Sequence, residues 1–152
     1  MADLKYEMLP YAEYTESDYR QIWHDKYSVK PIKTHDGISV YFYDNNFDHA
    51  FYESTGRNVG KKSPLHKDVL SQPRLERMLW IRDTLEDTTA KMVAGYDSKT
   101  KSYVRNKRVS IVKGNYVVVI QLYGDMTHAK FITAYVADNS IEKILRSPNW
   151  KI

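Results

Sequence analysis

Cysteine is absent from the 152-residue chain, and this absence excludes several kinds of chemistry at once. Without thiols the chain has no disulfides, no thiolate nucleophile and no cysteine-ligated zinc or iron–sulfur centre. Long apolar runs are also missing, because the longest, YVVVI at residues 116–120, is far too short to span a bilayer. No apolar segment follows a basic N-terminal stretch, so we expect no signal peptide and no membrane partner. These features predict a protein of a reducing compartment such as a bacterial cytoplasm.

Acidic side chains are scarce in the second part of the chain. Residues 1–53 carry 10 acidic and 5 basic side chains, whereas residues 54–152 carry 9 acidic and 18 basic ones. Between Asp97 and Asp125 there are six Lys or Arg and no carboxylate. This clustering is typical of a face that binds a polyanion, although strand lysines that prevent edge aggregation give the same pattern. Tyrosine supplies 13 of the aromatic residues and suits half-buried or wet surfaces.

Helical periodicity dominates the first half of the chain. Residues 1–14 show no pattern and are interpreted as a loose lead-in to a single domain over 15–152. Thr15 is the predicted cap of a short helix, and Asp36-Gly37 is a predicted turn before a strand through residues 38–42. The segment FDHAFYES, residues 47–54, is expected to form one or two helical turns with its phenylalanines buried. A longer helix is predicted over 72–87, with a proline in its first turn.

Alternating periodicity replaces helical periodicity from residue 91. Four successive strands are predicted, in the segments 91–97, 102–113, 115–124 and 129–138. Their links are short and allow only hairpins, which favours an antiparallel meander. A brief helix after residue 140 closes the chain. The expected fold is therefore α+β, with N-terminal helices packed on a four-stranded antiparallel sheet and a short C-terminal helix.

The faces of two predicted strands hold the candidate polar site. In the last strand Phe131, Thr133 and Tyr135 are expected on one face, opposite Ile132, Ala134 and Val136. In the second strand Tyr103, Arg105 and Lys107 share one side, and Asn106, Arg108 and Ser110 share the other. Sequence leaves open which set joins Thr133 and Tyr135. Arginine, hydroxyls and a ring on one face suit a phosphate and a base, although Thr and Tyr are also ordinary strand residues.

Four segments occur in a suggestive order: FDHAFYES, KDVLSQPRLERMLWIRDTL, NYVVVIQL and AKFITAYVAD. Together they resemble the phage branch of the barnase–EndoU–colicin–RelE nuclease superfamily, over about residues 38–150. The resemblance implies a metal-independent endoribonuclease without cofactors, of the toxin or effector type. It also implies RNA as partner, with tRNA among the candidate targets, an antitoxin or immunity protein as a second partner, and a bacterial or phage-infected host cytoplasm as its location.

The resemblance carries site roles to matching positions of this chain. His49 matches the histidine of the FDHAF segment. The basic residue of the second strand is matched by Arg105, Lys107 or Arg108. Thr133 and Tyr135 match the TAY segment. Arg77 is a further candidate for the same cleft. Glu53, four residues after His49, is either an orienting partner of the imidazole or an ordinary surface carboxylate. Lys61 and Lys62 in the basic loop are added as substrate-binding candidates.

The expected chemistry uses the nucleophile of the RNA itself. A base removes the proton of the 2′-OH, an acid protonates the leaving 5′-oxygen and a cation stabilises the phosphate, which gives a 2′,3′-cyclic phosphate. His49 suits either proton transfer because histidine titrates near neutrality. Three alternatives stay open: a metal nuclease using His49 and Glu53, a non-catalytic nucleic-acid-binding module, and a module that binds a host protein. The other four histidines show no partner pattern and are read as surface or loop residues.

Overall fold

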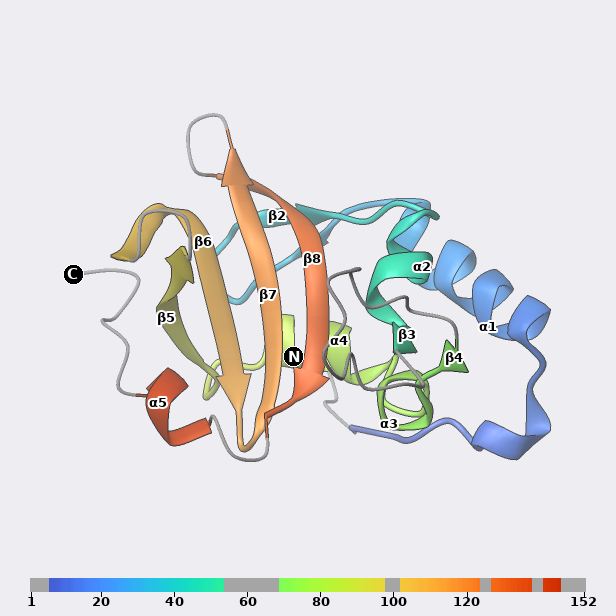
Figure 1. Ribbon diagram of the computed structural model, residues 1–152. Helices are drawn as coiled ribbons and strands as arrows, with labels where there is room; N and C mark the ends of the chain where they lie inside the picture. Colours follow the sequence, from blue (N-terminus) through green and yellow to red (C-terminus); the bar gives the residue numbers. More distant parts are fainter. Residues whose placement is uncertain (1–5, 54–68, 98–101, 124–126, 138–140, 146–152) are drawn as a thin grey trace, which may run out of the picture.

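A mixed β-sheet forms the centre of the computed structural model, which describes residues 6–53, 69–97, 102–123, 127–137 and 141–145 (Figure 1). The strand order is β1-β2-β8-β7-β6-β5. The strands and their bounds are β1 (Ile32–Lys33), β2 (Ser39–Tyr41), β5 (Lys91–Asp97), β6 (Ser102–Lys113), β7 (Tyr116–Tyr123) and β8 (His128–Val136). A separate two-stranded sheet pairs β3 (Tyr52–Glu53) with β4 (Val69–Leu70).

The predicted meander is present as β5 to β8, all antiparallel to their neighbours. The α+β class is therefore confirmed, but the expectation of a four-stranded, purely antiparallel sheet is wrong. β2 joins the sheet parallel to β8, and β1 extends it further. Strands of two and three residues carry too little alternation to be assigned to a sheet from sequence.

Helical segments flank the sheet. They are a 3₁₀ turn (Tyr11–Glu13), α1 (Glu16–Trp23) with a π-helical continuation (His24–Ser28), α2 (Asn46–Ala50), α3 (Gln72–Leu75), α4 (Trp80–Glu86) and α5 (Ile141–Leu145). Thr15 caps α1 as predicted, through a reciprocal pair of hydrogen bonds with Asp18. The single helix predicted over 72–87 is instead α3 and α4, because tighter three-residue hydrogen bonds such as Met78 N–H to Leu75 O separate them.

Residues 6–14 show no sequence periodicity, yet they make specific contacts with the helical layer. The Leu9 amide donates to Glu76 O at 2.8 Å, and the Tyr6 amide donates to Asp83 at 2.8 Å. The Tyr6 ring also contacts Trp80 edge-on, with centroids 5.5 Å apart. Irregular backbone of this kind is held by individual bonds, which leave no periodic signal in the sequence.

The main apolar core lies between the helices and one face of the sheet. Its largest buried side chains include Trp23, Tyr27, Phe47 and Phe131. Trp23 stacks on Tyr27 at 4.7 Å between ring centroids and contacts Phe131 at 5.4 Å. The polar tips of these rings are satisfied, since Trp23 Nε1 donates to Tyr43 O and Tyr27 OH donates to Met78 O.

A smaller apolar cluster lies on the opposite face of the sheet. It consists of Val93, Val112, Val117, Val119 and Ala137, with Ile141 and Ile144 of α5 packed against it. The N-terminal helices therefore pack on one face of the sheet, and α5 covers part of the other.

A β-bulge in β8 changes the predicted alternation of that strand. The pairing with β7 shifts between Val119, opposite Thr133, and Ile120, opposite Phe131. The extra residue, Ile132, lets Phe131 and Ala134 both enter the main core. Phe131 was predicted on the face of Thr133 and Tyr135, and that prediction is wrong, whereas Thr133 and Tyr135 do share a face.

Candidate active site at the α2–β8 junction

Helix α2 turns His49 outward while its neighbours anchor the helix in the core. Phe47 and Ala50 are 0% and 1% exposed, whereas His49 is exposed. The Asn46 side chain accepts a hydrogen bond from the Tyr43 amide at 2.8 Å and so fixes the turn that enters the helix. The predicted burial of the phenylalanines is confirmed, and the imidazole lies at the surface rather than in the apolar interior.

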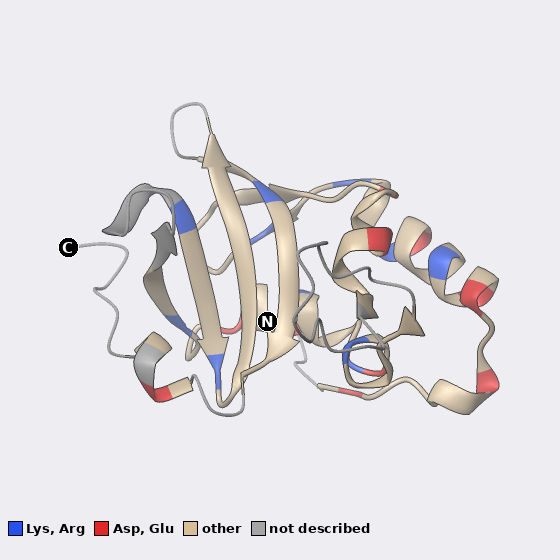
Figure 2. Cartoon of the chain, viewed as in Figure 1, with Lys and Arg blue, Asp and Glu red and all other residues tan. Residues whose placement is uncertain are grey.

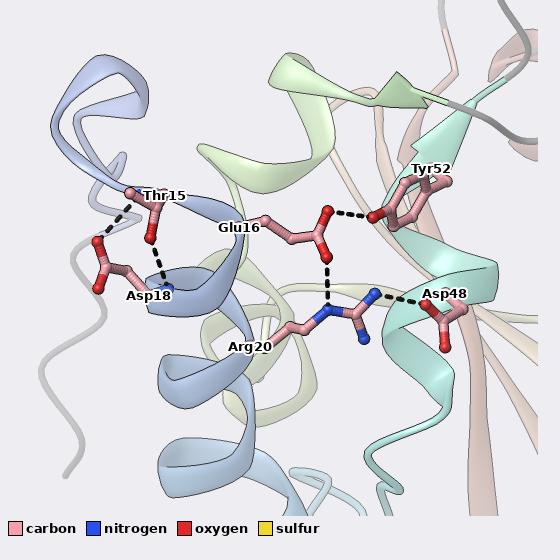
Figure 3. Close-up of polar contacts among 6 residues, drawn as sticks. All are labelled: Thr15, Glu16, Asp18, Arg20, Asp48 and Tyr52. Carbon is pink, nitrogen blue, oxygen red and sulfur yellow. Dashed lines mark hydrogen bonds and ion pairs between the residues drawn. The ribbon is translucent and has the colours of Figure 1, made fainter.

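A polar network joins α2 to α1 (Figure 3). Arg20 of α1 donates to Glu16 at 3.1 Å and to Asp48 of α2 at 2.5 Å. Its guanidinium also lies 4.4 Å from the centroid of the Phe47 ring. Glu16 accepts a further short hydrogen bond from Tyr52 OH, just past the helix, and this bond followed by that of Arg20 lowers the pKa of Glu16. The residues on both sides of His49 are thus tied to α1.

The helix ends before it reaches Glu53. α2 stops at Ala50, and Tyr52 and Glu53 form β3, which pairs with Val69 and Leu70. The helical spacing predicted between His49 and Glu53 is therefore wrong, because the chain becomes extended between them. The Glu53 side chain lies outside the described part of the structure, as do Lys61 and Lys62.

Arg74 of α3 connects the end of α2 with β8. Its guanidinium donates to Ala50 O at 3.0 Å and contacts Thr133 Oγ1 at 3.5 Å. The same group lies 5.9 Å from the centroid of the Tyr135 ring. Burial raises the pKa of Tyr135, and the charge of Arg74 partly offsets that effect. A fixed cation therefore lies between the residue that follows His49 and the TAY hydroxyls.

Strand register places one basic residue of β6, Arg108, on the face of Thr133 and Tyr135. Arg108 lies opposite Gln121, which lies opposite Lys130, and Ser110 lies opposite Val119, which lies opposite Thr133. The guanidinium of Arg108 bonds Gln121 Oε1 at 3.4 Å. The side chains of Arg105 and Lys107 lie outside the described part of the structure.

A pocket of about 650 Å³ opens beside His49 at the edge of β8. Its lining comes from the loop before α2, from α2 and from β8, and comprises Tyr43, Asp44, Asn45, Asn46, His49, Lys130, Phe131 and Ile132. Lys130 is exposed and stands next to the bulge that turns Phe131 inward. The pocket therefore combines an imidazole, which can transfer protons, with an ammonium group, which can stabilise an anion.

The remaining candidate, Arg77, is engaged elsewhere. It bonds Pro73 O at 2.9 Å and Glu76 at 3.2 Å, and lies 5.0 Å from the Trp80 ring centroid. Sequence reasoning missed Arg74 and Lys130. Both stand inside the segments that carry the family resemblance, so the signal was present, but the choice between Arg74 and Arg77 depends on the break between α3 and α4.

No family model, curated protein or solved structure matches the chain. Within the described ranges, no group of three or more His, Asp or Glu residues is arranged to hold a metal ion. The helices in those same ranges include none that is both long and apolar enough to cross a bilayer.

Proposed function

We propose that the chain is a metal-independent endoribonuclease of the toxin or effector type. The observation that carries the proposal is the bridge made by Arg74, which contacts the carbonyl that follows His49 and the hydroxyl of Thr133. An exposed imidazole, a fixed guanidinium and the TAY side chains thus occur around one junction. The resemblance of the FDHAFYES and AKFITAYVAD segments to phage-type ribonucleases supports the same reading.

The reaction follows from the groups at the junction. The 2′-OH attacks the adjacent phosphorus while its proton passes to a base, and the bond to the 5′-oxygen breaks as that oxygen gains a proton. The products are a 2′,3′-cyclic phosphate and a 5′-hydroxyl. His49 serves as base or acid, and Arg74 stabilises the additional negative charge on the phosphate. Thr133 binds a non-bridging oxygen, Tyr135 contacts a base, and Arg108 and Lys130 attract the RNA.

The test compares three proteins on total RNA and on a defined oligonucleotide, with and without EDTA. His49→Ala should lower cleavage by about 10²–10⁴-fold, because one general acid or base contributes about that factor. His35→Ala is the matched control, since His35 is also exposed but lies in the turn between β1 and β2, where its amide donates to Leu85 O at 2.8 Å. Mass spectrometry of the new ends should show 2′,3′-cyclic phosphates from the wild type and from His35→Ala.

Two outcomes would overturn the proposal. Cleavage by His49→Ala at the wild-type rate would remove the imidazole from the mechanism. Binding of RNA by the wild-type protein without any cleavage would favour a non-catalytic module, which the cationic face of the sheet also supports.

A further inference from the structure

β7 ends and β8 begins at the same end of the sheet (Figure 1). Three aromatic rings contact one another there. Tyr41 stacks on His128 with centroids 5.9 Å apart and an interplanar angle of 21°. Tyr123 completes the group, at 6.4 Å from Tyr41 and 5.9 Å from His128. We call Tyr41, Tyr123 and His128 the ring cluster.

The ring cluster lies on the face that carries Arg108, Thr133 and Tyr135. Tyr123 is opposite His128, and two residues along the same strands Gln121 is opposite Lys130, which is itself opposite Tyr41. Residues two apart on a strand share a face, so the rings and Lys130 point the same way. Tyr123 is 44% exposed, whereas the residues between them, Leu122 and Ala129, are buried in the main core.

Cations lie near the ring cluster on this face of the sheet. Register places Lys33, Arg108 and Lys130 there, whereas Lys91 lies at the opposite end of the sheet and donates to Leu145 O. Figure 2 shows the basic bands on β6 and β8, against the mixed charges of α1. Asp44 lines the His49 pocket and contacts the His24 imidazole at 3.0 Å. Exposed rings beside cations are the combination that binds single-stranded nucleic acid.

The ring cluster is also continuous with the His49 pocket. Lys130 and Tyr43 both line that pocket, and Tyr43 is 50% exposed. Tyr43 follows Tyr41 of the ring cluster by two residues, and Lys130 is the strand partner of Tyr41. One strand of RNA can therefore contact the rings and the pocket together.

We propose that the ring cluster is a stacking subsite for unpaired bases of single-stranded RNA that flank the phosphate held at His49. Bases that are paired in a duplex are stacked on each other and cannot lie on these rings, so the subsite selects loops and unpaired ends. The proposal rests on the proposed ribonuclease function for the position of the cleaved bond. Stacking itself does not require cleavage.

The experiment tests whether the loss of a ring and the loss of a base weaken binding through the same contact, which we call ring–base coupling. It uses a 2′-O-methyl oligonucleotide, which cannot supply the nucleophile. Affinity is measured for the intact single strand, for the same strand with one base removed to leave an abasic site, and for its duplex. The abasic position is moved along the strand until the loss of affinity is greatest. Tyr123→Ala should weaken binding of the intact strand about tenfold, and should leave binding of the abasic strand and of the duplex unchanged.

Tyr123→Phe keeps the ring and should bind as the wild type does, and Tyr14→Ala, a half-buried tyrosine on the helical side, is the matched control. Unfolding curves of all variants show that each is folded. Equal weakening of the intact and abasic strands by Tyr123→Ala overturns the stacking subsite, as does absence of binding at low salt. If coupling is found but natural RNA is not cleaved, the subsite stands and only the ribonuclease proposal fails.

Discussion

The two faces of the sheet differ in burial and in polarity. The face under α1 and α4 buries Phe131, Ile120 and Ile111 almost completely, each at 1% exposure or less. The opposite face buries a few valines under α5 and then becomes polar, with Arg108, Lys130 and the ring cluster along it. A single strand, β8, serves both faces through alternate residues and one bulge. Most of the buried apolar side chains therefore lie on one face of the sheet, and the exposed cations and rings lie on the other.

This separation also explains why the candidate groups can be cationic. Burying an unpaired charge in the helix-covered core would cost several kcal/mol, whereas an exposed lysine or arginine on the open face keeps its hydration. The junction with α2 is the exception. There Arg74 is partly buried, and its hydrogen bonds to Ala50 O and Thr133 compensate for the lost water.

The largest effect should come from truncating the helix-covered face. Phe131→Ala removes a ring that contacts Trp23 and Phe42, and should lower the free energy of unfolding by about 3–5 kcal/mol. Tyr123→Ala, on the same sheet but 44% exposed, should cost less than about 1.5 kcal/mol. Urea unfolding measures both. Similar losses in the free energy of unfolding for the two variants would contradict the proposed difference in burial between the two faces.

A smaller effect on stability should follow from removing the carboxylate of Asp87, which accepts several hydrogen bonds beside the helices. Burial acts to raise its pKa, but hydrogen bonds from Thr89, Tyr6 and Lys113 outweigh burial, so the pKa lies well below the usual value. A depressed pKa in the folded state stabilises the protein above about pH 4, and this contribution is lost as pH falls below that value. Asp87→Asn should therefore cost about 1–3 kcal/mol at neutral pH and flatten the acid limb of the stability curve.

Asp83 provides the control of opposite sign. Burial raises its pKa, and a hydrogen bond from the Tyr6 amide only partly opposes that effect. The ionised form of Asp83 is therefore disfavoured in the folded protein. Asp83→Asn should not lower the free energy of unfolding at neutral pH. Unfolding curves collected between about pH 2 and pH 8 separate the two variants. If the free energy of unfolding of Asp87→Asn depends on pH as that of the wild type does, the Asp87 carboxylate does not stabilise the folded protein in this way.

The smallest effects should come from single charges on the open face. Arg108→Ala and Lys130→Ala should each reduce the slope of log affinity against log salt by about one, because each removes one phosphate contact. Each should change the free energy of unfolding by only about 0.5 kcal/mol or less. Lys26→Ala, an exposed lysine of the helical layer, should leave the salt slope unchanged. Titrations of single-stranded RNA at several salt concentrations decide, and equal slopes for all three variants would remove the open face from RNA binding.

Long alternating strands were predictable, and short or irregular elements were not. β6 and β7 repeat their pattern over 12 and 8 residues, enough to identify them and their hairpin. β2 has three residues and pairs in parallel with β8, which no local signal indicates. The bulge at Ile132 has no glycine to mark it, so simple alternation placed Phe131 on the wrong face.

The candidate site was predictable where burial decides direction. Phe47 and Ala50 bracket His49, and burying them necessarily turns the imidazole outward. Sequence did not separate Arg74 from Arg77, because the chain turns tightly after Leu75 and this turn changes the direction of Arg77. The rings of Tyr41, Tyr123 and His128 come from three strands, and only their register brings them together.

The pairing of β2 with β8 determines when the candidate site can form. Ser39 and His128 are partners although they lie about 90 residues apart in the chain. Contacts of such long range form late, because the intervening loop must be closed first. A nascent chain on the ribosome that has not yet released β8 has neither the pocket wall at Lys130 nor the rings at Tyr123 and His128 together. The candidate site at this junction therefore requires that β8 has been synthesised and has paired with β2.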